Sequence, residues 1–131
     1  MKINTKTEQF NVLPQKLYAY LSKIENLPEW ATSYALEVKK EGDDYKVVTP
    51  KGEMYEVFTT DEKTGVIDMR CGPSKDQMLT WPTRVTSDNM GGSLYSVTYF
   101  QAPDQSDEEY AAMQGDLDKE FQNIRDILEA A

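Results

Sequence analysis

The sequence predicts an α+β fold in which a curved antiparallel sheet wraps around one long C-terminal helix. Two observations support this prediction. Between Tyr34 and Gln101, short runs rich in Val, Tyr, Thr and Phe alternate with turn residues, which is typical of antiparallel strands joined by tight turns. After Ser106, an apolar stripe at helical spacing continues to Leu128, which indicates a helix that needs a long partner surface.

The N-terminal segment predicts one strand and two short helices. Lys2 to Val12 carries alternating β-branched residues and suits an edge strand. Pro14 can occupy the first position of a helix, and that helix should run for about three turns because apolar residues recur at spacings of four, four and three: Leu13, Leu17, Leu21 and Ile24. A second short helix is predicted over 26–31 and carries Pro28 and Trp30.

Five clusters of turn residues then divide the chain into six strands, which with the first strand makes a sheet of about seven. Connections this short join only antiparallel neighbours, because a parallel crossover needs about a dozen residues or more. The strands should therefore form a meander. The turn clusters are Glu41-Gly42-Asp43, Pro50-Lys51-Gly52, Asp61 to Gly65, Cys71 to Ser74 and Ser87 to Gly92.

The last helix carries the most specific local pattern. Ser106 and Glu109 have the spacing of a capping box, in which each side chain bonds the other residue's backbone amide. One apolar stripe follows, formed by Tyr110, Met113, Leu117, Phe121, Ile124 and Leu128. Charged residues are expected mostly on the opposite side, namely Asp116, Asp118, Lys119, Glu120 and Asp126. A sheet that covers such a helix must curl, and a hollow remains wherever the side chains do not meet.

Composition excludes several function classes. The 131 residues suffice for one domain. A net charge of −9 repels phosphate backbones, so nucleic acid is not expected as a partner. The chain has no histidine, which removes the commonest general base and metal ligand, and no nucleotide-binding motif. Cys71 is the single cysteine and should be a small buried apolar residue; no metal or cofactor site is predicted.

No apolar run approaches the ~20 residues of a membrane span, and the first ten residues lack a signal-peptide core, so a cytoplasmic protein is expected.

The order of these elements resembles the START-like superfamily, often called SRPBCC. This superfamily includes polyketide cyclase- and dehydrase-like proteins and plant pollen-allergen-like proteins. The residues that carry the resemblance are Leu13 to Leu17, Glu25-Asn26-Leu27-Pro28-Glu29-Trp30, Trp81 to Val85, Gly91-Gly92-Ser93 and Ala102 to Tyr110. The resemblance implies a helix-grip fold over one domain of residues 1–131, and an apolar or amphipathic small molecule held between sheet and helix. Leu13 departs from the pattern, because a small polar cap is expected before the proline.

Strand alternation predicts which side chains face the hollow, if charged residues point outward. The segment 54–60 is ambiguous, because Tyr55 and Val57 compete with Met54 and Phe58. Asp68, Arg70 and Arg84 are expected outside. The predicted ligand-binding residues are Trp30, Tyr34, Leu36, Tyr45, Val47, Tyr55, Met69, Trp81, Tyr95, Tyr99, Met113 and Leu117.

The tyrosines allow two interpretations. A buried phenol needs a hydrogen-bond partner, so several inward tyrosines suggest a wet or ligand-filled hollow. Alternatively, tyrosine is simply a good strand residue whose hydroxyl reaches solvent at the sheet rim. Trp30 and Trp81 could likewise stack on a ligand or close one end of the core.

Three function hypotheses follow. The first is binding of a small apolar or amphipathic molecule. The second is a polyketide cyclase- or dehydratase-like enzyme, which without histidine needs another acid or base, such as a carboxylate buried against aromatic rings. No catalytic residue is assigned, because the charged strand residues are expected outside. The third is an interaction module, and pairing into a homodimer stays open.

Overall fold

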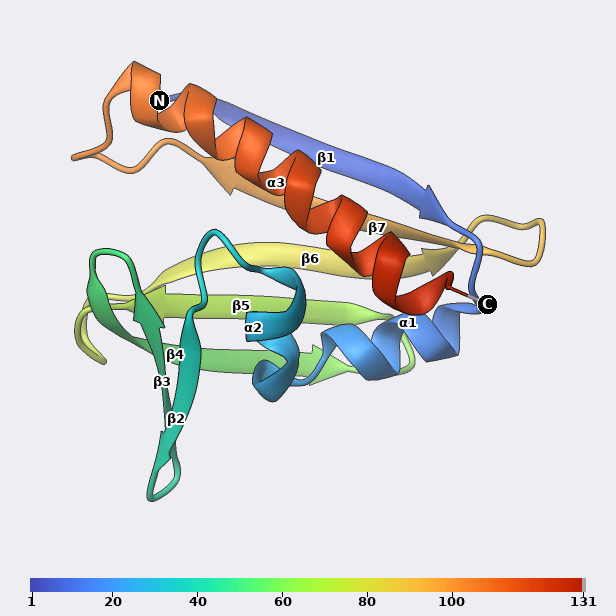
Figure 1. The fold of residues 1–131 in the computed structure, drawn as a ribbon, viewed down its shortest axis with the longest axis horizontal. Helices are drawn as coiled ribbons and strands as arrows, with labels where there is room; N and C mark the ends of the chain where they lie inside the picture. Colours follow the sequence, from blue (N-terminus) through green and yellow to red (C-terminus); the bar gives the residue numbers. More distant parts are fainter. Residues whose placement is uncertain (131) are drawn as a thin grey trace.

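The computed structural model describes residues 1–130 and forms one curved sheet with its helices on one face (Figure 1). All seven strands pair antiparallel in the order β1-β7-β6-β5-β4-β3-β2. The strands are β1 Ile3–Phe10, β2 Glu37–Glu41, β3 Asp44–Thr49, β4 Gly52–Asp61, β5 Val66–Gly72, β6 Leu79–Ser87 and β7 Ser93–Phe100. The helices are α1 Pro14–Leu21, the 3-10 turn η1 Ile24–Asn26, α2 Leu27–Trp30 and α3 Asp107–Leu128. The predicted α+β helix-grip fold is confirmed.

The N-terminal helix is shorter than predicted. Because α1 ends at Leu21, Ile24 lies in η1 instead of the helix. Leu17 and Leu21 are fully buried, whereas Leu13 precedes the helix with extended backbone and is 62% exposed. Leu17, Leu21 and Ile24 of the predicted stripe therefore belong to the core, and Leu13 does not. The predicted edge strand is confirmed, since β1 pairs with β7 alone.

Strand alternation is regular in β7 and corrects two predictions elsewhere. Ser93, Tyr95, Val97 and Tyr99 all face the interior. Leu36 was expected inside, but it lies in the loop before β2 and is 59% exposed. In β4, the ambiguous segment places Met54, Glu56 and Phe58 inward, so the inward position predicted for Tyr55 is wrong. The Tyr55 ring instead lies beneath the ammonium groups of Lys46 and Lys75.

The helix α3 meets the sheet in two ways. Its apolar side covers the inner face of the sheet, where the C-terminal half packs on the main core together with α1 and α2. Its other side meets β1 along a seam of polar contacts, because alternate residues of β1 point at the helix. The seam contacts are Asn4–Tyr110, Lys6–Asp118 and Glu8–Arg125.

The N-terminus of α3 has the predicted capping box. The Ser106 hydroxyl accepts from the Glu109 amide at 3.1 Å, and the Glu109 carboxylate accepts from the Ser106 amide at 3.0 Å. Both orphan amides are thereby satisfied. None of the helices within residues 1–130 combines the length and the hydropathy that a bilayer crossing requires.

Candidate ligand-binding cavity

A cavity of about 450 Å³ lies between the N-terminal half of α3 and strands β3 to β7. This volume falls within the range of about 300–1,000 Å³ that is usual for small-molecule sites. Its walls are mostly apolar, with Leu27 from α2, Ala31 directly after α2, Val97 from β7, and Ala112 and Phe121 from α3. The cavity therefore occupies the interface where the sequence predicts a hollow.

Seven of the predicted ligand-binding residues line this cavity: Trp30, Tyr34, Met69, Trp81, Tyr95, Met113 and Leu117. They come from α2 and the loop after it, from β5, β6 and β7, and from α3. Segments distant in sequence thus supply one continuous wall. Their assignment as ligand contacts stays a prediction.

The other five predicted residues lie elsewhere. Val47 is fully buried in the main core. Tyr99 is buried in a small cluster against Tyr110 and Trp81, so it supports the cavity wall from outside. Tyr45 packs at the margin of the core and donates to Glu25 at 3.1 Å. Leu36 and Tyr55 do not line the cavity, since Leu36 is exposed and Tyr55 contacts the two lysines described above.

Glu56 is a cavity residue that the sequence reasoning missed. It is 3% exposed and accepts a hydrogen bond from the Tyr34 hydroxyl at 2.7 Å. Burial raises the pKa of Glu56 to about 8, although the hydrogen bond from Tyr34 opposes the shift. Burial also raises the pKa of the neighbouring Cys71 thiol to about 11, and the Glu56 charge adds to this. Cys71 faces the cavity and is only partly buried.

A second buried carboxyl, Glu120, comes from α3. It is 6% exposed and accepts from the Ser33 amide at 3.2 Å. Burial raises the pKa of Glu120 to about 8; the amide opposes this shift and the Asp116 charge adds to it. Glu120 was expected on the charged side of the helix, and the structure corrects this. It lies three residues after Leu117, a spacing that keeps both on one helical face.

Two buried polar groups in the cavity wall have no hydrogen-bond partner within residues 1–130. They are the indole nitrogen of Trp30 and the hydroxyl of Tyr95; the Thr83 side chain is near enough to the Tyr95 hydroxyl to oppose the rise of its pKa, but it does not have the geometry of a hydrogen bond. Trp30 is 4% exposed and Tyr95 is fully buried, so water outside the protein does not reach them. The two polar atoms are also closed off from the cavity space, so a molecule in the cavity reaches them only if a neighbouring side chain moves.

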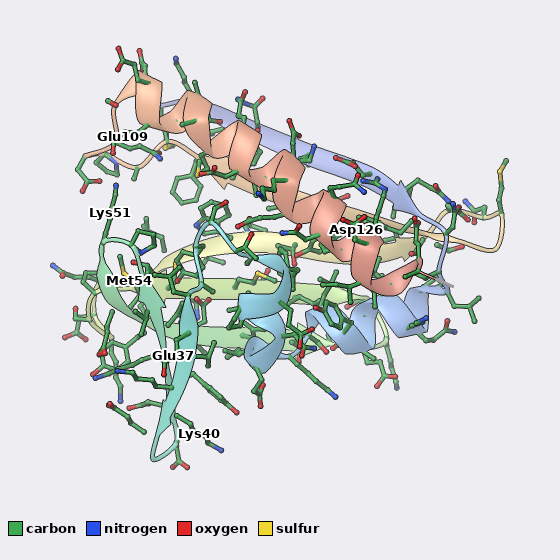
Figure 2. The ribbon with its side chains drawn as sticks, viewed as in Figure 1. Glu37, Lys40, Lys51, Met54, Glu109 and Asp126 are labelled. Carbon is green, nitrogen blue, oxygen red and sulfur yellow. The ribbon has the colours of Figure 1, made fainter. Side chains whose placement is uncertain are left out.

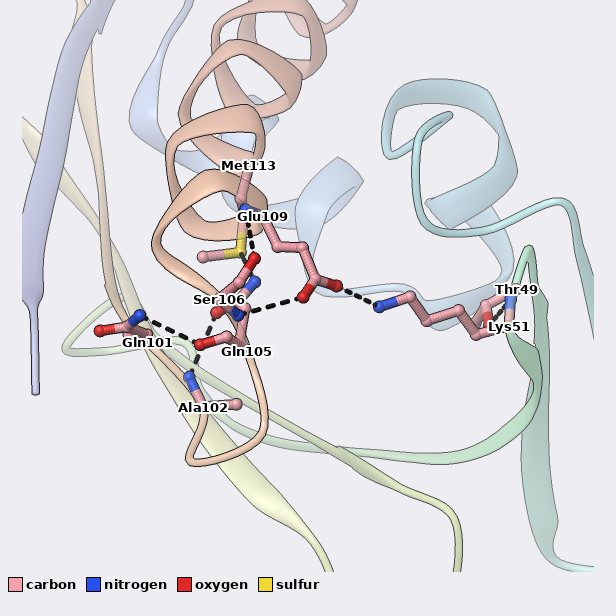
Figure 3. A network of polar contacts seen from close by, with 8 residues as sticks. All are labelled: Thr49, Lys51, Gln101, Ala102, Gln105, Ser106, Glu109 and Met113. Carbon is pink, nitrogen blue, oxygen red and sulfur yellow. Dashed lines mark hydrogen bonds and ion pairs between the residues drawn. The ribbon is translucent and has the colours of Figure 1, made fainter.

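The mouth of the cavity lies between the β3–β4 loop and the first turn of α3. Lys51 and Glu109 point toward each other across it, with Met54 beside the loop (Figure 2). Their charged atoms are 3.2 Å apart (Figure 3). Gln105 also lies here, where its amide nitrogen is 4.0 Å from the Met113 sulfur. One exposed ion pair thus joins the β3–β4 loop to the first turn of α3 across the mouth of the cavity.

Solved structures with the same architecture are numerous. The chain is similar over 100% of both lengths to XoxI from Bacillus cereus, with 16% identity and a TM-score of 0.74. It is similar to the Aha1 dimer from Colwellia psychrerythraea over 98% of this chain and 97% of that one, with 13% identity and a TM-score of 0.73. It is similar to Ara h 8.0201 over 95% and 94%, with 18% identity and a TM-score of 0.65.

No protein-family model matches the sequence, and no curated protein is a significant match. At these identities, the structural likeness shows the fold alone. The element order, the seven-stranded sheet and the neighbours agree on that fold. The chain has the helix-grip fold of the START-like, or SRPBCC, superfamily.

Proposed function

We propose that this protein binds one small amphipathic molecule in the cavity between α3 and the sheet. The observation that carries the proposal is a cavity of about 450 Å³ whose mostly apolar walls include two carboxyl groups, Glu56 and Glu120. An apolar body gains free energy by leaving water for such walls. A polar group on the same molecule would bond to the carboxyl oxygens that make no hydrogen bond within residues 1–130.

The contrast with the rest of the interior supports this proposal. The main core contains fully buried residues from three elements: Phe10, Leu17 and Ile124. The C-terminal half of α3 therefore packs tightly on the sheet and on α1. The cavity is thus confined to one end of a well-packed interface. A local hollow with a bridged mouth is the usual form of a small-molecule site.

Native mass spectrometry on the protein purified from its own host tests the proposal. We expect a bound small molecule that organic extraction removes. Its return should change the fluorescence of Trp30 and Trp81, which are the two tryptophans of the chain and both line the cavity.

A matched pair of variants makes this test specific. Met113→Trp places a large ring in the cavity and should abolish retention of the molecule. Met90→Trp adds the same ring at a turn where the native side chain is 91% exposed and should leave retention unchanged. Retention by a folded Met113→Trp variant would contradict the proposal, as would a wild-type protein that carries no molecule and gives no fluorescence response to apolar probes.

A second candidate function is acid–base catalysis on the bound molecule, and Glu56 favours it. A general acid or base works best with a pKa near the working pH, and burial raises the pKa of Glu56 to about 8. The Tyr34 hydroxyl would position this carboxyl. If the molecule is converted, liquid chromatography with mass spectrometry should show a new product with wild type, by changed mass for loss of water or by changed retention for an isomer, whereas Glu56→Gln should bind without conversion. Binding without any conversion by wild type would reject this candidate.

Pairing into a homodimer also stays a proposal for this chain. The similar Aha1 structure is a dimer, and light scattering after size exclusion measures the mass directly. A mass near 15.0 kDa would reject the dimer.

A further inference from the structure

We infer that the cavity selects amphipathic amines, in which an apolar body carries a protonated amino group that pairs with Glu56 or Glu120. The inference rests on the proposed binding function and names the chemical class of the ligand. It follows from the signs of the charges around the cavity, from the unfilled bonding capacity of the two carboxyl groups and from their burial.

Acidic residues outnumber basic residues in the cavity wall. The acidic ones are Glu56, Glu109, Asp116 and Glu120, and within residues 1–130 the one basic residue is Lys51. Lys51 lies at the mouth with 78% of its side chain exposed, and it is already paired with Glu109. No cation of the described residues therefore faces the two buried carboxyl groups, so a positive ligand would be the partner that stabilises their ionised form, and a negative ligand would not.

Each buried carboxyl has bonding capacity to spare. Glu56 Oε1 accepts from Tyr34, and Glu120 Oε2 accepts from the Ser33 amide. Within the described residues, the other oxygen of each group makes no hydrogen bond. A carboxylate accepts at both oxygens, and an ammonium group supplies three donors and one positive charge. An amine thus provides what both sites lack.

The surroundings of the two carboxyl groups also predict how protons move on binding. Tyr34 and Cys71 face Glu56, while Asp116 and Tyr95 face Glu120, and none of these neighbours is cationic. Burial raises the pKa of both carboxyl groups to about 8, so at pH 7 each is mostly protonated. A bound ammonium group stabilises the ionised form. Binding of an amine should therefore release a proton, and binding of a fatty-acid anion should take one up.

Three unbranched probes with ten carbon atoms each test this inference: decylamine, 1-decanol and decanoate. Each is titrated at pH 7 and about 150 mM salt, where attraction to the exposed surface charges is screened. Tryptophan fluorescence reports affinity and stoichiometry. Calorimetry in two buffers of different ionisation enthalpy reports proton exchange. We expect one site, at least about tenfold tighter binding of decylamine than of decanoate, and proton release for the amine alone.

Matched glutamine variants locate the effect. Glu56→Gln and Glu120→Gln keep the shape of each side chain and remove its charge, and at least one of them should lower the preference for the amine over the alcohol about tenfold or more. Glu53→Gln in β4 and Glu108→Gln in α3 are the controls, because both residues are exposed and outside the cavity. They should leave the preference unchanged. Decanol binding verifies that each variant is folded.

The outcomes separate the two proposals. Decanoate binding as tight as decylamine, or an amine preference that survives both Glu56→Gln and Glu120→Gln, overturns the amine inference. If decanol and decanoate bind with the tryptophan response and the amine gains nothing, the binding function stands and the inference alone fails. If the inference fails and native mass spectrometry also finds no retained molecule, both proposals fall.

Discussion

The two halves of α3 carry one continuous apolar stripe, yet they meet different surroundings. In the C-terminal half, Ile124 is fully buried and Leu128 is 8% exposed, while Phe121 is fully buried at the junction and also borders the cavity. In the N-terminal half, Met113 and Leu117 line the cavity, and Tyr110 packs in the small second cluster. The spacing of the stripe is the same in both halves, so the difference arises from what lies opposite.

Opposite the C-terminal half, the residues Phe10, Leu17 and Leu21 fill the space under the helix. Opposite the N-terminal half lie Trp30 of α2 and the inner faces of β5, β6 and β7, which leave a cavity that extends toward the β3–β4 loop. The C-terminal half of α3 thus packs in the core, and the N-terminal half forms one wall of the cavity. Stability and binding should therefore respond to mutations in different halves.

The largest expected effect is a loss of stability on truncation in the packed half. Ile124→Ala leaves a void in a closed core and should lower the free energy of unfolding by about 2–5 kcal/mol. Met113→Ala should cost less than about 1 kcal/mol, because its side chain is only partly buried and already borders open space. Urea unfolding measures both. Ile124→Val, expected to cost about 0.5–1.5 kcal/mol, keeps the comparison available if Ile124→Ala does not fold. Equal costs at positions 113 and 124 would remove the distinction between the halves.

The second effect is the pH dependence of stability, to which the buried carboxyl group of Glu56 in the cavity wall should contribute. The folded pKa of Glu56 is about 8 against an ordinary value of 4.5, so the folded state keeps a proton that the unfolded chain loses. Stability from this group is complete below about pH 4.5 and falls as the pH rises to about 8. Glu56→Gln cannot lose a proton here. As the pH rises over this interval, its free energy of unfolding should therefore increase relative to that of wild type by on the order of 2 kcal/mol.

Thermal and urea unfolding at pH 5 and pH 8.5 measure that gain. Glu53→Gln, at an exposed position of the same strand, is the control and should show no comparable change. The cost of Ile124→Val should also be the same at both pH values. A difference between wild type and Glu56→Gln that does not vary with pH would contradict the buried, protonated state of Glu56.

The smallest effect concerns the first turn of α3. Ser106→Ala removes one side of the capping box and should lower the free energy of unfolding by about 1 kcal/mol. Lys51→Met removes the ion pair with Glu109 and should change it by less than about 0.5 kcal/mol, because Lys51 is largely exposed. If Lys51→Met lowered the free energy of unfolding more than Ser106→Ala, the ion pair, and not the cap, would be what mainly stabilises the first turn of α3.

Much of the architecture could be predicted because local patterns determine it. The capping box at Ser106 and Glu109 requires only four consecutive residues, and the alternation of β7 requires only one strand. The cavity was less predictable, because it depends on how elements pack. Tyr99 faces inward as predicted, but Tyr110 from α3 covers it, and strand alternation does not specify where a helix will lie.

The two buried glutamates were missed for a related reason. The assumption that charged residues face solvent sets the orientation of most strands correctly and fails at Glu56. The pairing register contains the missing information, since Glu56 lies beside Cys71 on one side and Tyr45 on the other, and both were predicted inward. Cross-strand neighbours share a face. For Glu120, its position three residues after Leu117 was the available signal.

The polar seam between β1 and α3 has a mechanical consequence. Contacts at Asn4, Lys6 and Glu8 hold the helix along its length on one side. On the other side, Glu120 and Asn123 bond the segment around Trp30 to Ser33, and Lys51 pairs with Glu109 at the mouth. A tilt of the whole helix about the β1 seam would break all of these contacts, whereas a movement of the first turn away from the β3–β4 loop would break the exposed Lys51–Glu109 pair, which contributes little. A molecule would therefore pass at lowest cost between that loop and the first turn of α3.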